Sequence, residues 1–185
     1  MSDIKNIKVP LTTEAVKDLK AGERVTISGV IYTARDAAHA KLLKALEAGE
    51  ALPLELEGAV IYYVGPCPAK EGQIIGSCGP TTSYRMDSFA PTLINKGLKG
   101  MIGKGPRDEK VINAMKENNA VYFAAIGGAA AVIANAVKKA EVIAYPELGT
   151  EAVRRLEVED FPCIVAIDSK GNNLYESGVE AYKQG

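Results

Sequence analysis

The chain has 185 residues, a net charge of −1 and a pI of about 6.0, with 47% hydrophobic and 24% charged residues. This balance is typical of a globular domain and excludes a strongly basic nucleic-acid surface. No apolar run approaches the roughly 20 residues that span a bilayer, and the start is too polar for a signal peptide. We therefore expect one cytoplasmic domain, residues 1–185, that binds neither nucleic acid nor membrane.

The predicted elements alternate between short strands and helices from the start of the chain. β-Branched residues in apolar–polar alternation predict a half-buried strand over 23–34, and leucines on one stripe predict a helix over 36–49. A continuous apolar run between Gly and Pro predicts a buried strand over 58–66, and a second strand is predicted over 72–80.

The same alternation continues to the end of the chain. The predicted elements are a helix over 83–97 with a break at Pro91, a strand over 98–105, a helix over 106–119, a strand and turn over 120–128, a helix over 129–140, a strand over 141–148, and a closing hairpin over 161–175 with its turn at 169–173. This order predicts an α/β fold with a mixed sheet and flanking helices.

The stretch GPTTSYRMD follows the second predicted strand and combines a turn, two hydroxyls and an arginine. Gly79 and Pro80 end the strand, and a helix that starts there can be capped by Thr81 or Thr82. On such a helix Thr81 and Arg85 lie on the same face. Backbone N–H groups, a hydroxyl and a guanidinium would then converge, which suits a carboxylate. The alternative is a capped helix with an exposed arginine.

Two further cations lie where predicted strands end. Arg35 stands at a strand-to-helix junction, and Lys104 stands between two glycines at another. Loops at the carboxyl ends of strands usually carry the ligand contacts of α/β proteins. Together with Arg85, these cations would suit a small molecule with two carboxylates, although each alone could be a solvated surface charge. The spacing around GKG does not match a nucleotide-binding P-loop.

The three cysteines, Cys67, Cys78 and Cys163, are odd in number and widely spaced. A disulfide framework is therefore not expected. Three cysteines can hold an iron–sulfur cluster, but the chain has no C-x-x-C pair to support one. We expect this chain itself to bind no metal and no cofactor.

Several segments carry a resemblance to a known family. These are TARDAAHAKL, GPTTSYRMD, GLKGMIGKG, AAIGGAAAVIANAVKKAEV and DFPCIVAIDSKGNNLY. Over residues 5–178 the chain resembles the beta subunit, or C-terminal domain, of the class I iron–sulfur fumarases. The tartrate dehydratase beta subunits share much of this pattern. The resemblance implies a swivelling β/β/α domain that closes over an active site shared with an alpha subunit, in a heterotetramer of two alpha and two beta chains.

The resemblance also implies an activity, the reversible hydration of fumarate to (S)-malate. A [4Fe-4S] cluster bound by three cysteines of the alpha partner leaves one iron open to act as a Lewis acid on the substrate hydroxyl. Two alternatives stay open: L(+)-tartrate dehydration, and a non-catalytic carboxylate-binding module of the same fold. For a subunit without its partner we also expect exposed apolar surface.

By the same resemblance, Thr81 is the base that removes a proton from C3 of malate. A threonine hydroxyl needs adjacent positive charge for this task, which Lys104 and Arg85 would supply. Arg35 and Arg85 would bind the substrate carboxylates. The remaining candidates have supporting roles only: Asp36, His39, Gly79 and Thr82. Asp36 and His39 could orient Arg35 and shape the pocket, or could merely cap and pack a helix.

Overall fold

The computed structural model describes residues 3–126 and 130–183. Its strands are β1 (Lys5–Val9), β2 (Arg24–Thr33), β3 (Val60–Tyr62), β4 (Gly100–Gly103), β5 (Val121–Ala125), β6 (Val137–Ala144) and β7 (Val153–Ile167). Its helices are α1 (Thr13–Lys17), α2 (Asp36–Glu47), α3 (Ala90–Asn95), α4 (Glu109–Asn118), α5 (Ala130–Ala136) and α6 (Leu174–Tyr182), with single 3₁₀ segments η1 (Ser83–Met86) and η2 (Pro146–Glu151). None of these helices is long and apolar enough to cross a membrane.

All the described strands belong to one mixed sheet in the order β1-β2-β3-β4-β5-β7-β6. Strands β1 to β5 run parallel, whereas β7 is antiparallel to β2, β5 and β6. Because β2 also pairs with β7, the strands from β2 to β5 close with β7 into a barrel-like ring. The predicted α/β class with a mixed sheet and flanking helices is confirmed.

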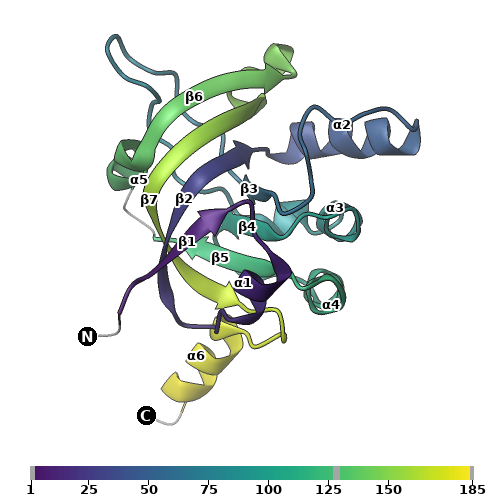
Figure 1. Cartoon of the computed structure of the whole chain (residues 1–185), viewed down its shortest axis with the longest axis vertical. Coiled ribbons are helices and arrows are strands. Elements are labelled where there is room, and N and C mark those ends of the chain that lie inside the picture. The colour runs from purple at the N-terminus through teal and green to yellow at the C-terminus, as the bar shows by residue number, and fades with distance from the viewer. Residues whose placement is uncertain (1–2, 127–129, 184–185) are drawn as a thin grey trace.

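Strand β3 is buried on both faces, which explains why its sequence is apolar at every position. Val60 and Tyr62 pack into one core with side chains of β2, β5 and β7, which lies inside the ring. Ile61 and Tyr63 pack into a second core with α2, α3 and α4, which cover the outer face of the ring. Figure 1 shows these three helices along one side of the sheet, away from α5. A strand buried on both faces needs apolar residues at every position.

Three predictions of local structure are wrong. No strand forms over 72–80, where the chain is irregular. At Gly76 the chain passes so close to the backbone of Cys67 that a side chain would not fit. The helix predicted over 129–140 ends at Ala136, and the chain continues directly as β6. The predicted closing hairpin does not form, because the chain after the turn is helix α6 and not a second strand. Residues 127–129, which hold the end of the predicted turn and the first residue of the predicted helix, lie outside the described part of the chain.

Two elements near the start and one half of the longest strand were not predicted at all. β1 and α1 precede the first predicted strand, and β7 begins eight residues before the predicted hairpin arm. β1 pairs with β2 from Lys5↔Val25 to Val9↔Gly29. It therefore extends the parallel side of the sheet.

Candidate functional site

Three of the predicted site residues lie on neighbouring strand ends. Arg35 follows β2 by two residues, and Lys104 directly follows β4. Between them, the backbone amide of Thr81 donates to the carbonyl of Tyr63, 2.8 Å away, at the end of β3. Because β2, β3 and β4 are parallel neighbours, their carboxyl ends share one edge of the sheet. The prediction that cations gather at strand ends is confirmed for Arg35 and Lys104.

The local structure of GPTTSYRMD differs from the predicted capped helix. No helix starts at Pro80; Thr82 instead pairs with Lys104 as an isolated parallel bridge. The amide of Ser83 donates to the carbonyl of Lys104 at 2.9 Å, and only then does the four-residue η1 begin. The Thr82 side chain makes no capping hydrogen bond, so that prediction is wrong.

Thr81 precedes η1 and is only half-buried, so the expected helical alignment of Thr81 with Arg85 is also wrong. Gly79 is exposed, and a side chain there would face Ala130 of α5. The sequence motif thus forms an extra ladder rung beyond β3 and β4. Neighbouring backbone strands, rather than a helix end, hold its two threonines.

Arg85 is held next to Arg35 by an ion pair with Asp36. Its Nε donates to Oδ1 of Asp36 at 2.8 Å. The other oxygen of Asp36 accepts from Nη2 of Arg35 over a longer 3.4 Å. Asp36 is the first residue of α2, which begins after Arg35, so it bridges the two predicted carboxylate-binding arginines.

Arg35 has a second acidic neighbour. Its Nε lies 3.7 Å from Oε1 of Glu151 in η2, too far for a hydrogen bond, and neither atom has another partner within the described chain. The side chain of Arg35 also passes Gly65, where a Cβ would come within 3.2 Å of the Arg35 Cδ. Three elements thus confine this guanidinium.

His39 is fully buried below the same corner. Its Nδ1 lies 2.8 Å from the carbonyl of Arg35, so Nδ1 carries the proton and donates, and Nε2 has no partner in the described structure. The ring packs edge-on against Tyr63, with 5.4 Å between ring centroids. Burial lowers the pKa of His39 from 6.5 to about 4. His39 is therefore neutral near pH 7 and packs α2 without facing solvent.

A buried ion pair beneath the site was missed by sequence reasoning. Arg107 Nε donates to Oδ1 of Asp87 at 2.6 Å, and both side chains are almost fully buried. Asp87 also accepts from the amide of Asp108, at 2.7 Å. The Arg107 guanidinium donates to Tyr63 Oη at 3.2 Å and lies 4.9 Å from the centroid of the Tyr122 ring. Nothing in the residue pattern distinguishes this arginine from a surface charge.

Tyr122 connects that buried layer to the site. Its hydroxyl lies 2.8 Å from both Ser83 Oγ and the carbonyl of Gly105. From the other side, Tyr175 of α6 accepts from the amide of Gly105 at 3.0 Å. The segments that follow Thr82 and Lys104 are thereby fixed to β5 and α6.

The cysteines do not form a ligand set. Cys67 is exposed, whereas Cys78 and Cys163 are buried. Burial raises the pKa of Cys78 to about 11 and also raises that of Cys163, so both are protonated thiols at neutral pH. Within residues 3–126 and 130–183, no three His, Cys, Asp or Glu side chains are grouped to hold a metal ion. These residues do not fit an iron–sulfur cluster.

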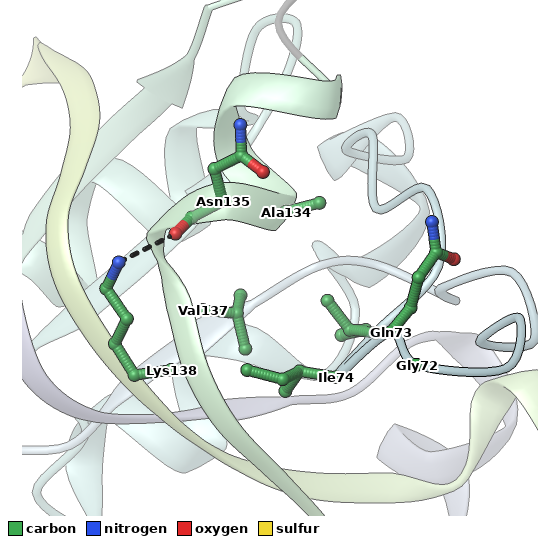
Figure 2. A pocket seen from close by; sticks show the side chains of 8 residues that line it. Gly72, Gln73, Ile74, Ala134, Asn135, Val137 and Lys138 are labelled. Atoms are coloured by element: carbon green, nitrogen blue, oxygen red, sulfur yellow. Dashed lines mark hydrogen bonds between the residues drawn. The ribbon is translucent and has the colours of Figure 1, made fainter.

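A separate hollow lies between the irregular 66–78 loop and α5. It has a volume of about 310 Å³ and is lined by Gln73, Ile74, Asn135 and Lys138, among others (Figure 2). Lys138 Nζ donates to the carbonyl of Asn135 at 3.0 Å across one side. The exposed Ile74 and Val142 line an adjoining hollow. Whether this surface is part of an apolar patch large enough to mark a subunit interface stays a prediction.

The comparisons with known proteins identify the family. Residues 2–178 match the family described as "Fumarase C-terminus". "Fumarate hydratase class I, aerobic" of Salmonella typhimurium is 43% identical over 155 residues, 83% of this chain and 27% of the relative. "Fumarate hydratase 2" of Leishmania major is 42% identical over 156 residues, 83% of this chain and 28% of the relative.

A third relative is similar in size to this chain. A protein of Methanocaldococcus jannaschii, provisionally named L(+)-tartrate dehydratase subunit beta, is 42% identical over 172 residues, 90% of this chain and 88% of the relative. The chain belongs to the Fumarase C-terminus family, which confirms the resemblance to the beta part of class I fumarases. It spans little more than a quarter of the length of the fumarate hydratases it matches.

Proposed function

We propose that this chain is the beta subunit of a hydro-lyase that reversibly hydrates fumarate to (S)-malate. The observation that carries the proposal is the common position of Arg35, Thr81 and Lys104 on three adjacent parallel strand ends, with Arg85 drawn to the same corner by Asp36. Family membership supports the reaction class.

The arginines bind the dicarboxylate in this proposal. The Arg85 side chain is about half exposed and donates to Asp36 only through Nε, so no hydrogen bond of the described structure occupies its two terminal nitrogens. A guanidinium fork matches a carboxylate with two parallel hydrogen bonds. Arg35 supplies the second cation, and two cations suit the two carboxylates of fumarate or malate.

Thr81 moves the proton. In the dehydration direction, the Thr81 hydroxyl first gives its own proton to solvent, and the resulting alkoxide accepts the C3 proton of malate. The C3–H electron pair forms the double bond while the C2 hydroxyl leaves as water, with a proton from an acid of the alpha partner. Lys104 supports that step because the bridge to Thr82 places its backbone one residue from Thr81, and its side chain is exposed and takes no part in the ion pairs of the described residues. A preorganised cation also stabilises the charge that develops on the adjacent carboxylate.

We assign the [4Fe-4S] cluster to the alpha partner because the cysteines of this chain do not form a ligand set. We further propose that the complete enzyme is a heterotetramer of two alpha and two beta chains and that it is cytoplasmic. The relative named as a tartrate dehydratase subunit beta supports an enzyme of more than one subunit.

L(+)-Tartrate is the alternative substrate. It is favoured by one observation, the relative named as a tartrate dehydratase subunit beta, of which this chain covers 88%. Tartrate is also a four-carbon dicarboxylate, so the same arginines would bind it. Its additional hydroxyl would have to be recognised by the partner or by Lys104.

The test is turnover by the reconstituted pair. The chain is assembled anaerobically with its alpha partner, and loss of fumarate absorbance is followed, with (R,R)-tartrate as the second substrate. The Thr81→Ala variant should lower kcat by roughly a hundredfold or more, because it removes the base and leaves substrate binding. Thr92→Ala, at an exposed threonine of α3, is the matched control and should retain full activity.

The outcomes separate the three candidates. Activity that requires both chains and is lost only in Thr81→Ala supports the proposal, and the preferred substrate names the enzyme. A cluster-loaded pair that binds dicarboxylates but turns over neither substrate would identify a non-catalytic binding module instead.

A further inference from the structure

Asp36 stands out because its carboxylate contacts both proposed substrate-binding arginines. Oδ1 accepts from Arg85 Nε at 2.8 Å, and Oδ2 lies 3.4 Å from Arg35 Nη2. The two arginines come from separate places, since Arg35 precedes α2 and Arg85 belongs to η1. No backbone hydrogen bond joins these two segments within the described chain. Besides apolar packing, the Asp36 carboxylate therefore links the two segments through its ion pairs.

We propose that Asp36 is a positioning residue that orients Arg85, and with it Arg35, toward the substrate carboxylates. The inference rests on the proposed dicarboxylate reaction. It assigns Asp36 no contact with the substrate; Asp36 acts through the arginines that it holds.

The atoms that are used favour orientation over blockage. A guanidinium has five N–H donors. Asp36 takes only the Nε donor of Arg85, which leaves the terminal fork of Nη1 and Nη2 for a carboxylate. An acid that competed with the substrate at Arg85 would occupy that fork instead. At Arg35, Asp36 contacts one fork nitrogen, Nη2, over a longer 3.4 Å, and leaves Nη1. The contact also fixes the side-chain torsions of a long residue that is otherwise about half exposed, so less freedom is lost on substrate binding.

Glu151 and Gly65 are the other neighbours of the Arg35 guanidinium. Glu151 faces Arg35 Nε at 3.7 Å, and the missing side chain of Gly65 gives Arg35 the space to lie between them. Two nitrogens of Arg35 thus face acids: Nη2 faces Asp36 and Nε faces Glu151. The third nitrogen, Nη1, lies next to Gly65. Asp36 is the only one of these residues that contacts both arginines among the described ion pairs.

The first experiment asks whether Asp36 orders Arg85, and it needs no activity. In the ¹⁵N-labelled chain, exchange of the Arg85 Nε–H with water is compared with that of Arg24, an exposed arginine with no ion pair in the described structure. We expect slower exchange for Arg85 in the wild type. In Asp36→Asn it should approach the rate of Arg24. Exchange that is equally slow in the variant would overturn the inference.

The second experiment asks whether this order serves the substrate. In the reconstituted enzyme, Asp36→Asn should raise KM for the dicarboxylate roughly tenfold, the loss expected for a weakened charge-assisted contact, with a smaller change in kcat. Glu109→Gln is the matched control: it also removes an acid from the first turn of a helix, but one that forms no ion pair with an arginine among the described residues. It controls for the loss of charge near a helix N-terminus.

The control should leave KM unchanged. An unchanged or lower KM in Asp36→Asn, or an equal rise in Glu109→Gln, would overturn the positioning role. If the wild-type pair is inert on every dicarboxylate, the proposed function fails, while the exchange measurement still decides whether Asp36 orders Arg85. The two failures are therefore distinguishable.

Discussion

The amide of Ser83 donates to the carbonyl of Lys104 at 2.9 Å, and Thr82 pairs with Lys104 beside it. The segment that carries Thr81 and the segment that carries Lys104 thus form one short ladder beyond the sheet. The proposed base and its supporting cation depend on the same backbone contacts. A change that separates these segments should affect catalysis and stability together.

Gly103 is the position where such a change is simplest to make. A Cβ at Gly103 would clash with Ser83 Oγ, which lies in the space that a side chain would fill. Because overpacking of a buried site typically costs 1–3 kcal/mol, Gly103→Ala should lower the free energy of unfolding by roughly 2 kcal/mol and reduce turnover. Urea denaturation measures the first effect. Gly178→Ala, in α6 with open space around it, is the control and should be neutral or slightly stabilising.

Loss of the Asp87 carboxylate should destabilise the fold strongly. Asp87→Ala leaves the buried Arg107 guanidinium without its counter-ion and removes the acceptor for the Asp108 amide. An uncompensated buried charge should lower the free energy of unfolding by about 4 kcal/mol. In the control Asp18→Ala, an exposed pair with Lys5 is lost, and little change is expected. Similar losses in both variants would contradict the buried role of the Arg107 pair.

Removal of the Tyr122 hydroxyl should loosen the site without unfolding the protein. Tyr122→Phe deletes the contacts to Ser83 and to the Gly105 carbonyl while it keeps the ring. We expect a loss of about 1 kcal/mol in the free energy of unfolding, and a lower kcat because the two segments of the ladder are held less firmly. Tyr182→Phe, at a highly exposed position, provides the comparison. A Tyr122→Phe enzyme with unchanged stability and kcat would be at odds with this role.

His39 should make the fold sensitive to acid. Burial lowers its pKa from 6.5 to about 4, so between these values the unfolded chain binds a proton that the folded chain does not. Stability from this group is fully present above pH 6.5 and decreases as the pH falls toward 4, by about 3 kcal/mol in total. His39→Asn keeps a donor for the Arg35 carbonyl but cannot titrate. Its free energy of unfolding should therefore fall less steeply over this range, and a slope equal to wild type would argue against the buried neutral state.

The fold was predictable where local pattern and tertiary role agreed. β2, α2 and α4 have strong periodicity, and β3 has an apolar run with two faces to bury. The first half of β6, residues 137–140, was taken as the end of a helix, whereas its second half, 141–144, falls within a predicted strand. The pairing of β6 with β7 decides the outcome, since Lys139 lies opposite Glu157 and Glu141 opposite Arg155. Opposite charges across strands favour this register, but they lie far apart in the sequence.

The candidate site was predictable to a similar degree. The strand-end positions of Arg35 and Lys104 were predicted correctly because a cation after a strand has a predictable location in a parallel sheet. The backbone around Thr81 was not, since Gly-Pro followed by two threonines suits a capped helix and a ladder rung equally well. Arg107, Asp87 and Tyr122 were missed because only the folded chain shows that these polar groups are buried together.

Strand β7 has a consequence for how the molecule is made. It is the partner that closes the ring, because it pairs with β2, β5 and β6. Until residues 153–167 have emerged from the ribosome, β2 and β5 each keep an unpaired edge, and the inner core stays open to water. Closure of the ring is then a late step of folding. The nascent chain is most vulnerable to aggregation just before its last strand arrives.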